Sequence, residues 1–356
     1  MSVDTVPVPE STTPAGSDVL LSVRNLRTTF DTDAGLVRAV DGVSFDVRRG
    51  EVLAIVGESG SGKSVTAMSI LGLLPSPPAI IEGDGIFWKG ENLLTAGPQR
   101  MRQVRGGEIA MIFQDPLSAL NPVHRVGKQI AEMVRQHRGL NRSDAWAKAV
   151  EVLGLVGIPQ PERRANMHPH EFSGGMRQRA MIAMAISCNP DLLIADEPTT
   201  ALDVTVQAQV LDVLMEIKDE VDSAIMLITH DLGVVAGLAD RVMVMYGGKQ
   251  VETGDAHELF YETRHPYTLG LLASLPRLDD VGDEELLPIR GAPPSLLKLP
   301  PGCAFHPRCD HSNGREVCRT DVPELRVIGS GDHRSACHFA EELVGGVSRS
   351  DAEVGS

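Results

Sequence analysis

The sequence predicts an α/β protein built on a largely parallel, doubly wound sheet, and three features predict it. An apolar run at 52–56 leads into a glycine-rich loop and then a helical stretch. Two further apolar runs, 192–195 and 224–228, each end in polar residues, and a helical stretch at 204–221 joins them. This alternation is typical of parallel sheets, whose ligands lie at the carboxyl ends of the strands. We therefore expect functional residues directly after these strands.

The remaining elements are predicted in chain order. Short alternating apolar runs over 19–53 indicate antiparallel strands. Residues 65–74 predict a helix that ends before Pro75, and 83–88 predict another strand. The long, mixed-charge stretch 125–157 contains few helix breakers and predicts a helical region.

Composition limits the class of protein. A chain of 356 residues is long enough for one large core domain and a smaller appendage. Its hydrophobic content of 42% and charged content of 23% are those of an ordinary soluble globular protein, and no apolar run is long enough to span a bilayer. The formal net charge of −15 argues against a general nucleic-acid binder, so no nucleic-acid partner is expected.

Four segments are expected along the chain. Residues 1–18 are rich in Pro, Ser and Thr but lack the basic start and apolar core of a secretory signal, and we expect them to be disordered. The main domain is expected over 19–280. A proline-rich segment follows, which places a boundary near Asp280, a small domain at 281–340 and a flexible tail at 341–356.

The loop at 57–64, Gly-Glu-Ser-Gly-Ser-Gly-Lys-Ser, fits the phosphate-binding loop pattern. Glycines let the backbone curl until several N–H groups point at one phosphate. Lys63 supplies a positive charge, and the hydroxyl of Ser64 can ligate Mg²⁺. The expected nucleotide-binding positions are Gly57, Ser59, Gly60, Ser61, Gly62, Lys63, Ser64 and Val65.

Four polar residues follow the expected strands of the sheet. Asp196 can hold Mg²⁺, and Glu197 can polarise a water for attack on a γ-phosphate. His230 follows the strand at 224–228, and Gln114 ends the apolar run 109–113. Taken alone, these residues have simpler interpretations as a solvated acidic strand end, a surface histidine and a surface glutamine. The phosphate-binding loop is what favours catalysis.

With these motifs, the chain resembles the nucleotide-binding subunits of ATP-binding-cassette (ABC) transporters, because residues 172–179 look like that family's signature ahead of a helix. The resemblance implies a P-loop NTPase fold with a parallel sheet core, an antiparallel β subdomain and a helical subdomain at about 115–180. It also implies that Ser173, Gly174 and Gly175 bind the γ-phosphate of ATP held by a second homologous ATPase subunit, in a head-to-tail dimer.

The resemblance assigns the catalytic roles position by position. Lys63 matches the phosphate-loop lysine. Ser64 and Asp196 match the residues on the Mg²⁺ side, Glu197 matches the catalytic base, and His230 matches the switch histidine. ATP and Mg²⁺ are therefore the expected ligands of the ATPase domain.

Three further positions complete the resemblance, which has two departures in the signature. Gln114 matches the loop residue that links the nucleotide to the permease, and its amide could reach Mg²⁺ or the catalytic water. Phe30 matches the aromatic residue that stacks on adenine. Residues 201–203 resemble the loop between subunits. The signature has Phe172 in place of Leu and Met176 where Gln is commoner. Neither removes a charged group, so a competent hydrolytic site is expected.

Five longer runs resemble the oligopeptide/dipeptide importer branch: 114–122, 168–176, 201–207, 265–268 and 301–309. This implies an ATP hydrolase on the cytoplasmic side of the cell membrane, peripheral to it, that energises the import of di- or oligopeptides. The implied partners are two transmembrane permease subunits and an extracytoplasmic peptide-binding protein. Related cassettes also serve nickel or glutathione.

Two other functions stay open. A non-transport ABC ATPase would keep the cassette, but such proteins usually carry two cassettes or a long coiled coil, and this chain has neither two sets of motifs nor sustained heptads. A metal-dependent scaffold subunit with an idle nucleotide site is the second alternative. The intact Lys63, Asp196, Glu197 and His230 argue against it.

The chain has four clustered cysteines near its end. Clustered thiols in a reducing compartment indicate a metal more than disulfides, and the spacing leaves Zn²⁺ and an iron–sulfur cluster open. The resemblance implies an iron–sulfur cluster of the 4Fe–4S type with a structural role. Cys188, away from this group in an apolar helix, is expected in the core. The cluster cysteines are Cys303, Cys309, Cys318 and Cys337, with four histidines nearby, His306, His311, His333 and His338.

Overall fold

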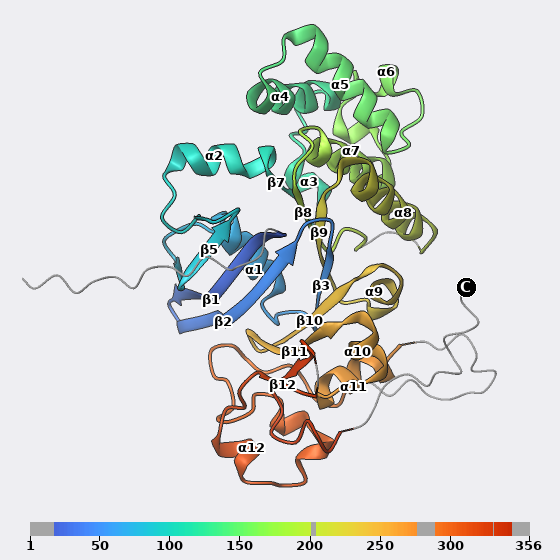
Figure 1. The fold of residues 1–356 in the computed structure, drawn as a ribbon. Helices are drawn as coiled ribbons and strands as arrows, with labels where there is room; N and C mark the ends of the chain where they lie inside the picture. Colours follow the sequence, from blue (N-terminus) through green and yellow to red (C-terminus); the bar gives the residue numbers. More distant parts are fainter. Residues whose placement is uncertain (1–17, 201–203, 276–288, 330, 344–356) are drawn as a thin grey trace, which may run out of the picture.

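A central sheet organises the chain in the computed structural model, which describes residues 18–200, 204–275, 289–329 and 331–343. Figure 1 shows this sheet in the middle of the molecule, with the helices α3 to α8 above it. The residues described after position 288, which we call the C-terminal segment (289–329 and 331–343), lie below it. Within the described residues, its eight strands are, in spatial order, β12 (Arg326–Val327), β13 (Arg334–Ser335), β11 (Lys249–Asp255), β10 (Arg241–Tyr246), β3 (Val52–Val56), β9 (Ala224–Thr229), β8 (Leu192–Asp196) and β7 (Ile109–Ile112).

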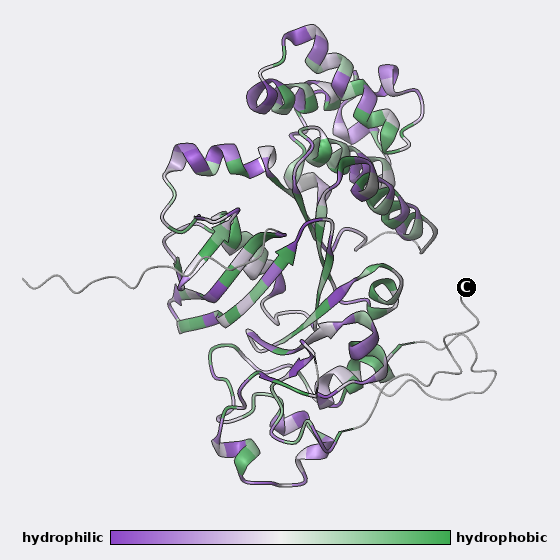
Figure 2. Cartoon of the chain, in the orientation of Figure 1, coloured by the Kyte–Doolittle hydropathy of each residue, from purple (hydrophilic) through white to green (hydrophobic). Residues whose placement is uncertain are grey.

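The core of the central sheet is parallel. Strands β10, β3, β9, β8 and β7 pair in parallel, whereas β11, β13 and β12 are added antiparallel at one edge. Every residue of β3, β8 and β9 is buried, which explains why these strands read as continuous apolar runs. Figure 2 shows the same strands as predominantly hydrophobic ribbons. The predicted parallel, doubly wound sheet is confirmed.

A second, antiparallel sheet packs beside the first. Its strands are β1 (Val19–Thr32), β2 (Gly35–Arg48), β4 (Ala79–Glu82), β5 (Gly85–Trp88) and β6 (Glu91–Asn92). They pair in the order β2-β1-β5-β6, with β4 also on β1. The prediction of antiparallel strands over 19–53 is confirmed. The strand predicted at 83–88 begins two residues later than expected, because Gly83 takes a positive φ of 159° between β4 and β5.

The helices have the following bounds. They are α1 (Lys63–Ile70), α2 (Pro98–Gly107), α3 (Pro116–Ala119), α4 (Val126–Arg138), α5 (Arg142–Leu155), α6 (Pro161–Arg164), α7 (Gly174–Ile186), α8 (Val204–Val221), α9 (Leu232–Leu238), α10 (Ala256–Tyr261), α11 (Pro266–Ala273) and α12 (Val317–Thr320), with short 3₁₀ turns η1 (Pro169–Glu171), η2 (His306–Arg308) and η3 (Asp310–Ser312). Helices α3 to α7 form the projecting helical part that lies at the top of Figure 1.

One helix prediction had the wrong bounds, and glycines mark where the helices end. The helix predicted at 65–74 runs over Lys63–Ile70 instead, because Gly72 takes a left-handed φ of 57° just after its end. The helical region predicted at 125–157 is confirmed, and it consists of two helices. Gly139 ends α4 with a φ of 67°, and the Asn141 side chain caps the start of α5.

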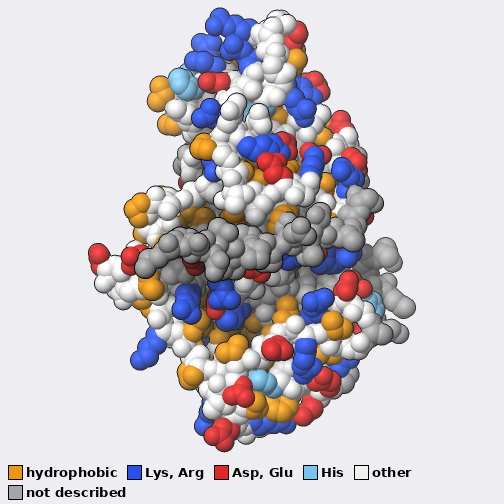
Figure 3. All heavy atoms as spheres, turned by 60° about the vertical axis from the view of Figure 1, so that its left-hand side comes forward, with side chains coloured by type: hydrophobic (Ala, Val, Ile, Leu, Met, Phe, Trp, Pro, Cys, Tyr) orange, Lys and Arg blue, Asp and Glu red, His pale blue; other side chains and the backbone are white. Residues whose placement is uncertain are grey.

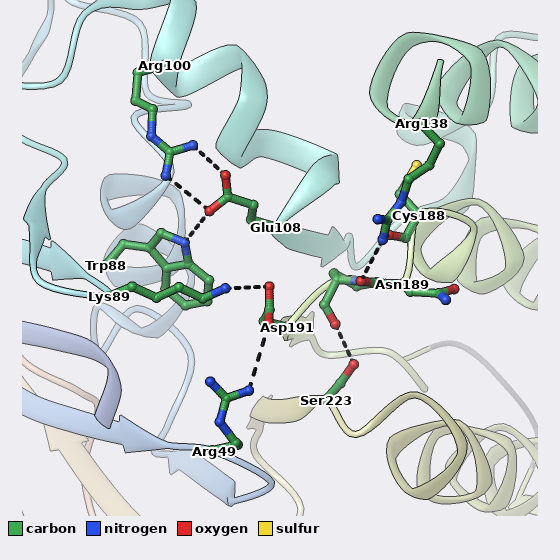
Figure 4. A network of polar contacts seen from close by, with 11 residues as sticks. Arg49, Trp88, Lys89, Arg100, Glu108, Arg138, Cys188, Asn189, Asp191 and Ser223 are labelled. Atoms are coloured by element: carbon green, nitrogen blue, oxygen red, sulfur yellow. Dashed lines mark hydrogen bonds and ion pairs between the residues drawn. The ribbon is translucent and has the colours of Figure 1, made fainter. Parts of the chain in front are cut away.

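A polar network joins the two sheets (Figure 4). The indole N–H of Trp88 on β5 donates to Glu108 Oε2 at 2.6 Å, and Arg100 of α2 also binds this carboxylate. The hydrogen bond from Arg100 is the main reason that the pKa of Glu108 is lowered. Beside it, Lys89 contacts Asp191 at 2.8 Å at the start of β8. The network therefore fixes the orientation of the antiparallel sheet against the parallel one.

The C-terminal segment is attached to the central sheet by β13, which pairs with β11. Leu343 is buried, and its carbonyl accepts a hydrogen bond from Arg264 at 2.6 Å. The tail expected from residue 341 therefore begins after Leu343 at the earliest. The rest of that tail, the N-terminal segment 1–17 and the boundary expected near Asp280 lie outside the described residues.

Candidate nucleotide-binding site

The predicted phosphate-binding loop connects β3 to α1. At two of its glycines, close packing leaves no room for a side chain. Gly57 has a φ of 150°, and a Cβ there would lie 2.3 Å from the carbonyl oxygen of Met245 on β10. Gly62 has a φ of 105°, and a Cβ there would lie 2.4 Å from the carbonyl oxygen of Ala39. A larger residue at either position would push the loop away from its neighbouring strands.

Polar groups of the loop point inward. The ammonium group of Lys63 donates to the carbonyls of Gly57 at 2.6 Å and Glu58 at 3.1 Å. Burial lowers the pKa of Lys63, while the nearby carboxylates act in the opposite direction. The Ser61 hydroxyl is buried and has no hydrogen-bond partner among the residues that the structure describes. A buried polar atom without a partner fits a loop that receives a polar ligand.

The outer side of the loop borders a cavity of about 270 Å³. Ser59 and Gly60 are exposed there, and no heavy atom lies within 4 Å of a Cβ built at Gly60. Val37 of β2 lines the same cavity, and its cross-strand partner is the half-buried Phe30 on β1. Val65 lies on α1, half-buried against the apolar core. Phe30 is thus placed one strand away from the cavity beside the loop.

The predicted Mg²⁺ ligands meet at the start of α1. The hydroxyl of Ser64 donates to Asp196 Oδ1 at 2.8 Å. Asp196 is only 6% exposed, and burial is the main reason that its pKa is raised. A hydroxyl beside a carboxylate is an oxygen donor set that fits Mg²⁺, and a cation there would favour the charged form of Asp196.

Glu197 is the centre of the second group of polar side chains. Its Oε2 accepts hydrogen bonds from the Gln114 amide at 3.0 Å and the Thr200 hydroxyl at 2.9 Å. His230 Nδ1 lies 3.6 Å from the same oxygen. Glu197 has a left-handed φ of 47°, and its N–H donates to the carbonyl of Ile228 on β9 at 2.8 Å. Strained backbone of this kind is often found at functional sites.

The structure therefore brings Gln114, Glu197 and His230 together, as the strand ends predicted. Thr200 was not among the predicted site residues. Thr200 could have been predicted as a partner of Glu197 because its hydroxyl follows that carboxylate by only three positions. Residues 201–203, expected to form the inter-subunit loop, lie outside the described residues.

The signature lies at the start of α7. Ser173 is the N-cap residue of this helix, and its hydroxyl accepts from the N–H of Met176 at 3.4 Å. Gly174 and Gly175 form the first turn. Nothing lies within 4 Å of a Cβ at Gly174, whereas one at Gly175 would lie 2.9 Å from Val206 of α8. The departure from the usual signature, Phe172, is buried in the core, where a large apolar residue is suited.

The four clustered cysteines line one cavity of about 100 Å³. Burial raises the pKa of Cys309 to about 11 and that of Cys337 to about 12. These thiols therefore need a bound cation to become thiolates near neutral pH. Cys303 and Cys318 complete the set, and burial raises their pKa as well.

In the described residues, the candidate ligand atoms around this cavity are not gathered as closely as the ligands of a bound zinc ion. Bonds of about 2.3 Å in a tetrahedral zinc site place the sulfur atoms about 3.8 Å apart. Among the residues that the structure describes, no three ligand atoms of the cavity lie within 4.8 Å of one another. His306 Nδ1 and His338 Nε2 each lie 2.9 Å from a backbone carbonyl oxygen. His333 instead contacts the buried Glu252, outside the cavity.

Cys188 lies apart from this group. It is fully buried, as predicted, although it comes two residues after the end of α7 and not within the helix. Its thiol lies 3.7 Å from the carbonyl oxygen of Met133 on α4. Cys188 is therefore part of the packing between these helices.

The fold and the site together define an ABC-type nucleotide-binding ATPase. Residues 40–200 match the family described as ABC transporter, and residues 251–318 match the oligopeptide/dipeptide transporter C-terminal region. The chain is similar to the dimeric structure of MJ0796, a bacterial ABC transporter cassette, at 25% identity with a TM-score of 0.59, covering 67% of this chain and 99% of that one. The structure of cbiO1 from Clostridium perfringens aligns with a TM-score of 0.57 at 27% identity, covering 68% of this chain and 91% of that one.

Two curated relatives have a higher sequence identity to this chain than these solved structures do. The oligopeptide transport ATP-binding protein OppD of Salmonella typhimurium is 49% identical over 93% of this chain and 97% of its own length. The dipeptide transport ATP-binding protein DppD of Bacillus subtilis is 51% identical over 91% of this chain and 95% of its own length. The chain belongs to this family of peptide-transport ATP-binding proteins. Among the helices that the structure describes, none has the length and apolarity to cross a membrane.

Proposed function

We propose that this chain binds and hydrolyses ATP to energise the import of di- or oligopeptides through a membrane ABC transporter. The observation that carries this proposal is the convergence of the phosphate-binding loop, the Ser64–Asp196 pair and the group around Glu197 at one edge of the parallel sheet. Four segments far apart in the sequence, at residues 57–64, 114, 196–200 and 230, supply the parts that phosphoryl transfer requires. The peptide-transport relatives support the choice of substrate.

The residues have separate roles in the proposed reaction. The loop N–H groups and Lys63 bind the phosphates of ATP, and Phe30 stacks on adenine. Ser64, Asp196 and Gln114 would hold Mg²⁺, which when bound neutralises charge on the β- and γ-phosphate oxygens. Because the reaction is mostly positioning and electrostatic stabilisation, the protein needs no covalent intermediate.

Glu197 is the proposed general base. It accepts hydrogen bonds from Gln114 and Thr200 through the same oxygen, Oε2. Its other oxygen accepts no hydrogen bond from the residues that the structure describes, so we propose it as the acceptor for a water proton. His230 is 61% exposed at this edge and is placed to contact the γ-phosphate or the attacking water.

The active unit is proposed to be a head-to-tail dimer with a second homologous cassette. Ser173, Gly174 and Gly175 present the N-terminus of α7, a favourable site for the γ-phosphate bound to the partner cassette. The complex would include two transmembrane permeases and an extracytoplasmic peptide-binding protein, with this chain peripheral on the cytoplasmic side. On the face that Figure 3 shows, acidic and basic side chains are interspersed.

We further propose that the ATPase domain extends to about residue 280 and that a small cysteine-rich C-terminal domain follows, holding an iron–sulfur cluster of the 4Fe–4S type. The support is that the four thiols line one cavity. When bound, such a cluster would cross-link the segment and supply a cation for the thiolates. Anaerobically purified protein should contain iron and labile sulfide, Cys309→Ser should lose both, and Cys188→Ala should keep them.

The transport proposal is tested by purifying the complex of an affinity-tagged chain from gently solubilised membranes and identifying its partners. Two permeases and a second cassette are expected to co-purify with it. A chain that has ATPase activity but no permease would be a non-transport ABC ATPase instead. Nickel or glutathione that stimulates the complex more than peptides would identify another substrate, and a complex without turnover would indicate an idle scaffold.

A further inference from the structure

The C-terminal segment contacts the phosphate-binding loop directly. Arg308, which directly precedes Cys309, forms a two-armed ion pair with Glu58, the second residue of the loop. Its Nη1 lies 2.6 Å from Glu58 Oε2, and its Nη2 lies 2.9 Å from Glu58 Oε1. The two residues are 250 positions apart in the sequence. The Arg308 side chain is only 6% exposed and that of Glu58 is 24% exposed, so the pair is largely shielded from solvent.

The guanidinium is fixed on its other sides. Arg308 Nε donates to the carbonyl of Arg290 at 2.9 Å, and Nη2 donates to that of Gly291 at 3.2 Å. Its guanidinium carbon lies 5.9 Å from the centre of the Tyr246 ring and 6.0 Å from that of Phe305. Because every part of the fork has a partner, Arg308 is held in one orientation toward the loop.

Glu58 also holds the loop through its backbone. Its N–H donates to the hydroxyl of Tyr267 on α11 at 2.7 Å, and its carbonyl accepts from the Lys63 ammonium at 3.1 Å. The same carbonyl accepts from the N–H of Ser61 at 3.2 Å. A shift of Glu58 would therefore move groups that face the phosphates.

The segment after Arg290 lies beside the loop as well. Residues 293–297 line the cavity of about 270 Å³ together with Val37 and residues 58–61. The C-terminal segment thus both contacts the loop through Arg308 and lines the cavity beside it. Phe305, three residues before Arg308, packs on Tyr246 and Tyr267 with ring centroids 5.3 Å from each.

From these contacts we infer that Arg308 is a positioning residue of the nucleotide site, which holds the phosphate-binding loop in its binding conformation through Glu58. The C-terminal segment is then a part of the ATP site and not only an appendage to it. The inference rests on the proposed function of the loop. It assigns to Arg308 an effect on nucleotide affinity, while the chemical step stays with Glu197.

The test measures binding of a fluorescent ATP analogue to the full chain with wild-type protein, Arg308→Gln, Glu58→Gln and the double variant. We expect each single variant to raise the Kd roughly ten-fold and the double variant to be no weaker than either, because contacting partners act as one unit. In the assembled complex, the KM for ATP should rise in each single variant while kcat changes less than two-fold. Arg308→Lys should restore only part of the affinity, because an ammonium cannot form the two-armed pair.

Two controls distinguish a failure of the proposed ATP-binding function from a failure of the inference about Arg308. Arg290→Gln removes the neighbouring ion pair with Asp310, which is exposed and does not contact the loop, and should leave the Kd unchanged. If the wild-type chain and a Lys63→Ala variant both fail to bind the analogue, the proposed function itself is wrong. If wild type binds but Arg308→Gln and Glu58→Gln bind equally well, or if their effects add in the double variant, the inference about Arg308 is overturned.

Discussion

The hydroxyl of Ser64 donates a 2.8 Å hydrogen bond to Asp196, which joins the start of α1 to the end of β8. The two residues are 132 positions apart. They meet because β3, β9 and β8 are neighbouring parallel strands whose carboxyl ends share one edge. This contact places a hydroxyl and a carboxylate oxygen beside the phosphate-binding loop.

The Ser64–Asp196 pair predicts a change in the Mg²⁺ requirement. Asp196→Asn removes the carboxylate charge but keeps its size, so the free Mg²⁺ concentration for half-maximal ATP hydrolysis should rise about ten-fold or more. This concentration is measured by titrating Mg²⁺ at saturating ATP. Asp191→Asn, at the other end of β8, is the matched control and should leave the requirement unchanged. An unaltered Mg²⁺ titration of Asp196→Asn would exclude Asp196 from the metal site.

Glu197→Gln should separate binding from chemistry. The amide keeps the size of the side chain but cannot take a proton from water, so ATP turnover should fall about 100-fold or more. ATP affinity should stay within two-fold of wild type, and the closed dimer should accumulate with ATP in size-exclusion chromatography. Turnover equal to that of wild type would rule out Glu197 as the base.

The packing of Gly62 predicts a loss of stability that depends on position within the loop. In Gly62→Ala the new methyl group would meet the carbonyl oxygen of Ala39 at 2.4 Å and the residue would keep a φ of 105°. We expect a loss of at least about 2 kcal/mol in the free energy of unfolding. Gly60→Ala, with a φ of 78° but open space, should lose only about 1 kcal/mol. Denaturant titration compares them, and equal losses would contradict the packing argument.

His265 predicts a pH dependence of stability. It is fully buried, its Nδ1 accepts from the N–H of Tyr267 at 3.1 Å, and burial lowers its pKa to about 3. The unfolded chain therefore binds a proton below pH 6.5 that the folded chain does not, so stability is lost as the pH falls.

His265→Asn keeps an acceptor at this N-cap position but cannot titrate. Between pH 6.5 and 5, the wild-type free energy of unfolding should fall by about 1.6 kcal/mol in total more than that of His265→Asn. Denaturant titrations at both pH values provide the comparison. Parallel slopes would show that His265 does not titrate on unfolding.

Much of the fold and the site could be predicted, because their signals are local. The apolar runs of β3, β8 and β9 and the polar residues that follow them define one edge of a parallel sheet. The four clustered cysteines could be predicted to lie together because they are close in the sequence. By contrast, the pairing of β13 with β11 and the Arg308–Glu58 ion pair join segments far apart in the sequence. No periodicity or motif marks such contacts, since they depend on how the chain packs.

The most direct test of the account is ATP hydrolysis by the purified membrane complex reconstituted into liposomes, with and without the peptide-loaded binding protein. The account predicts that peptide and binding protein together stimulate hydrolysis several-fold and drive peptide uptake, and that Glu197→Gln abolishes both. Hydrolysis that is indifferent to peptide, with no uptake in the wild-type complex, would contradict it.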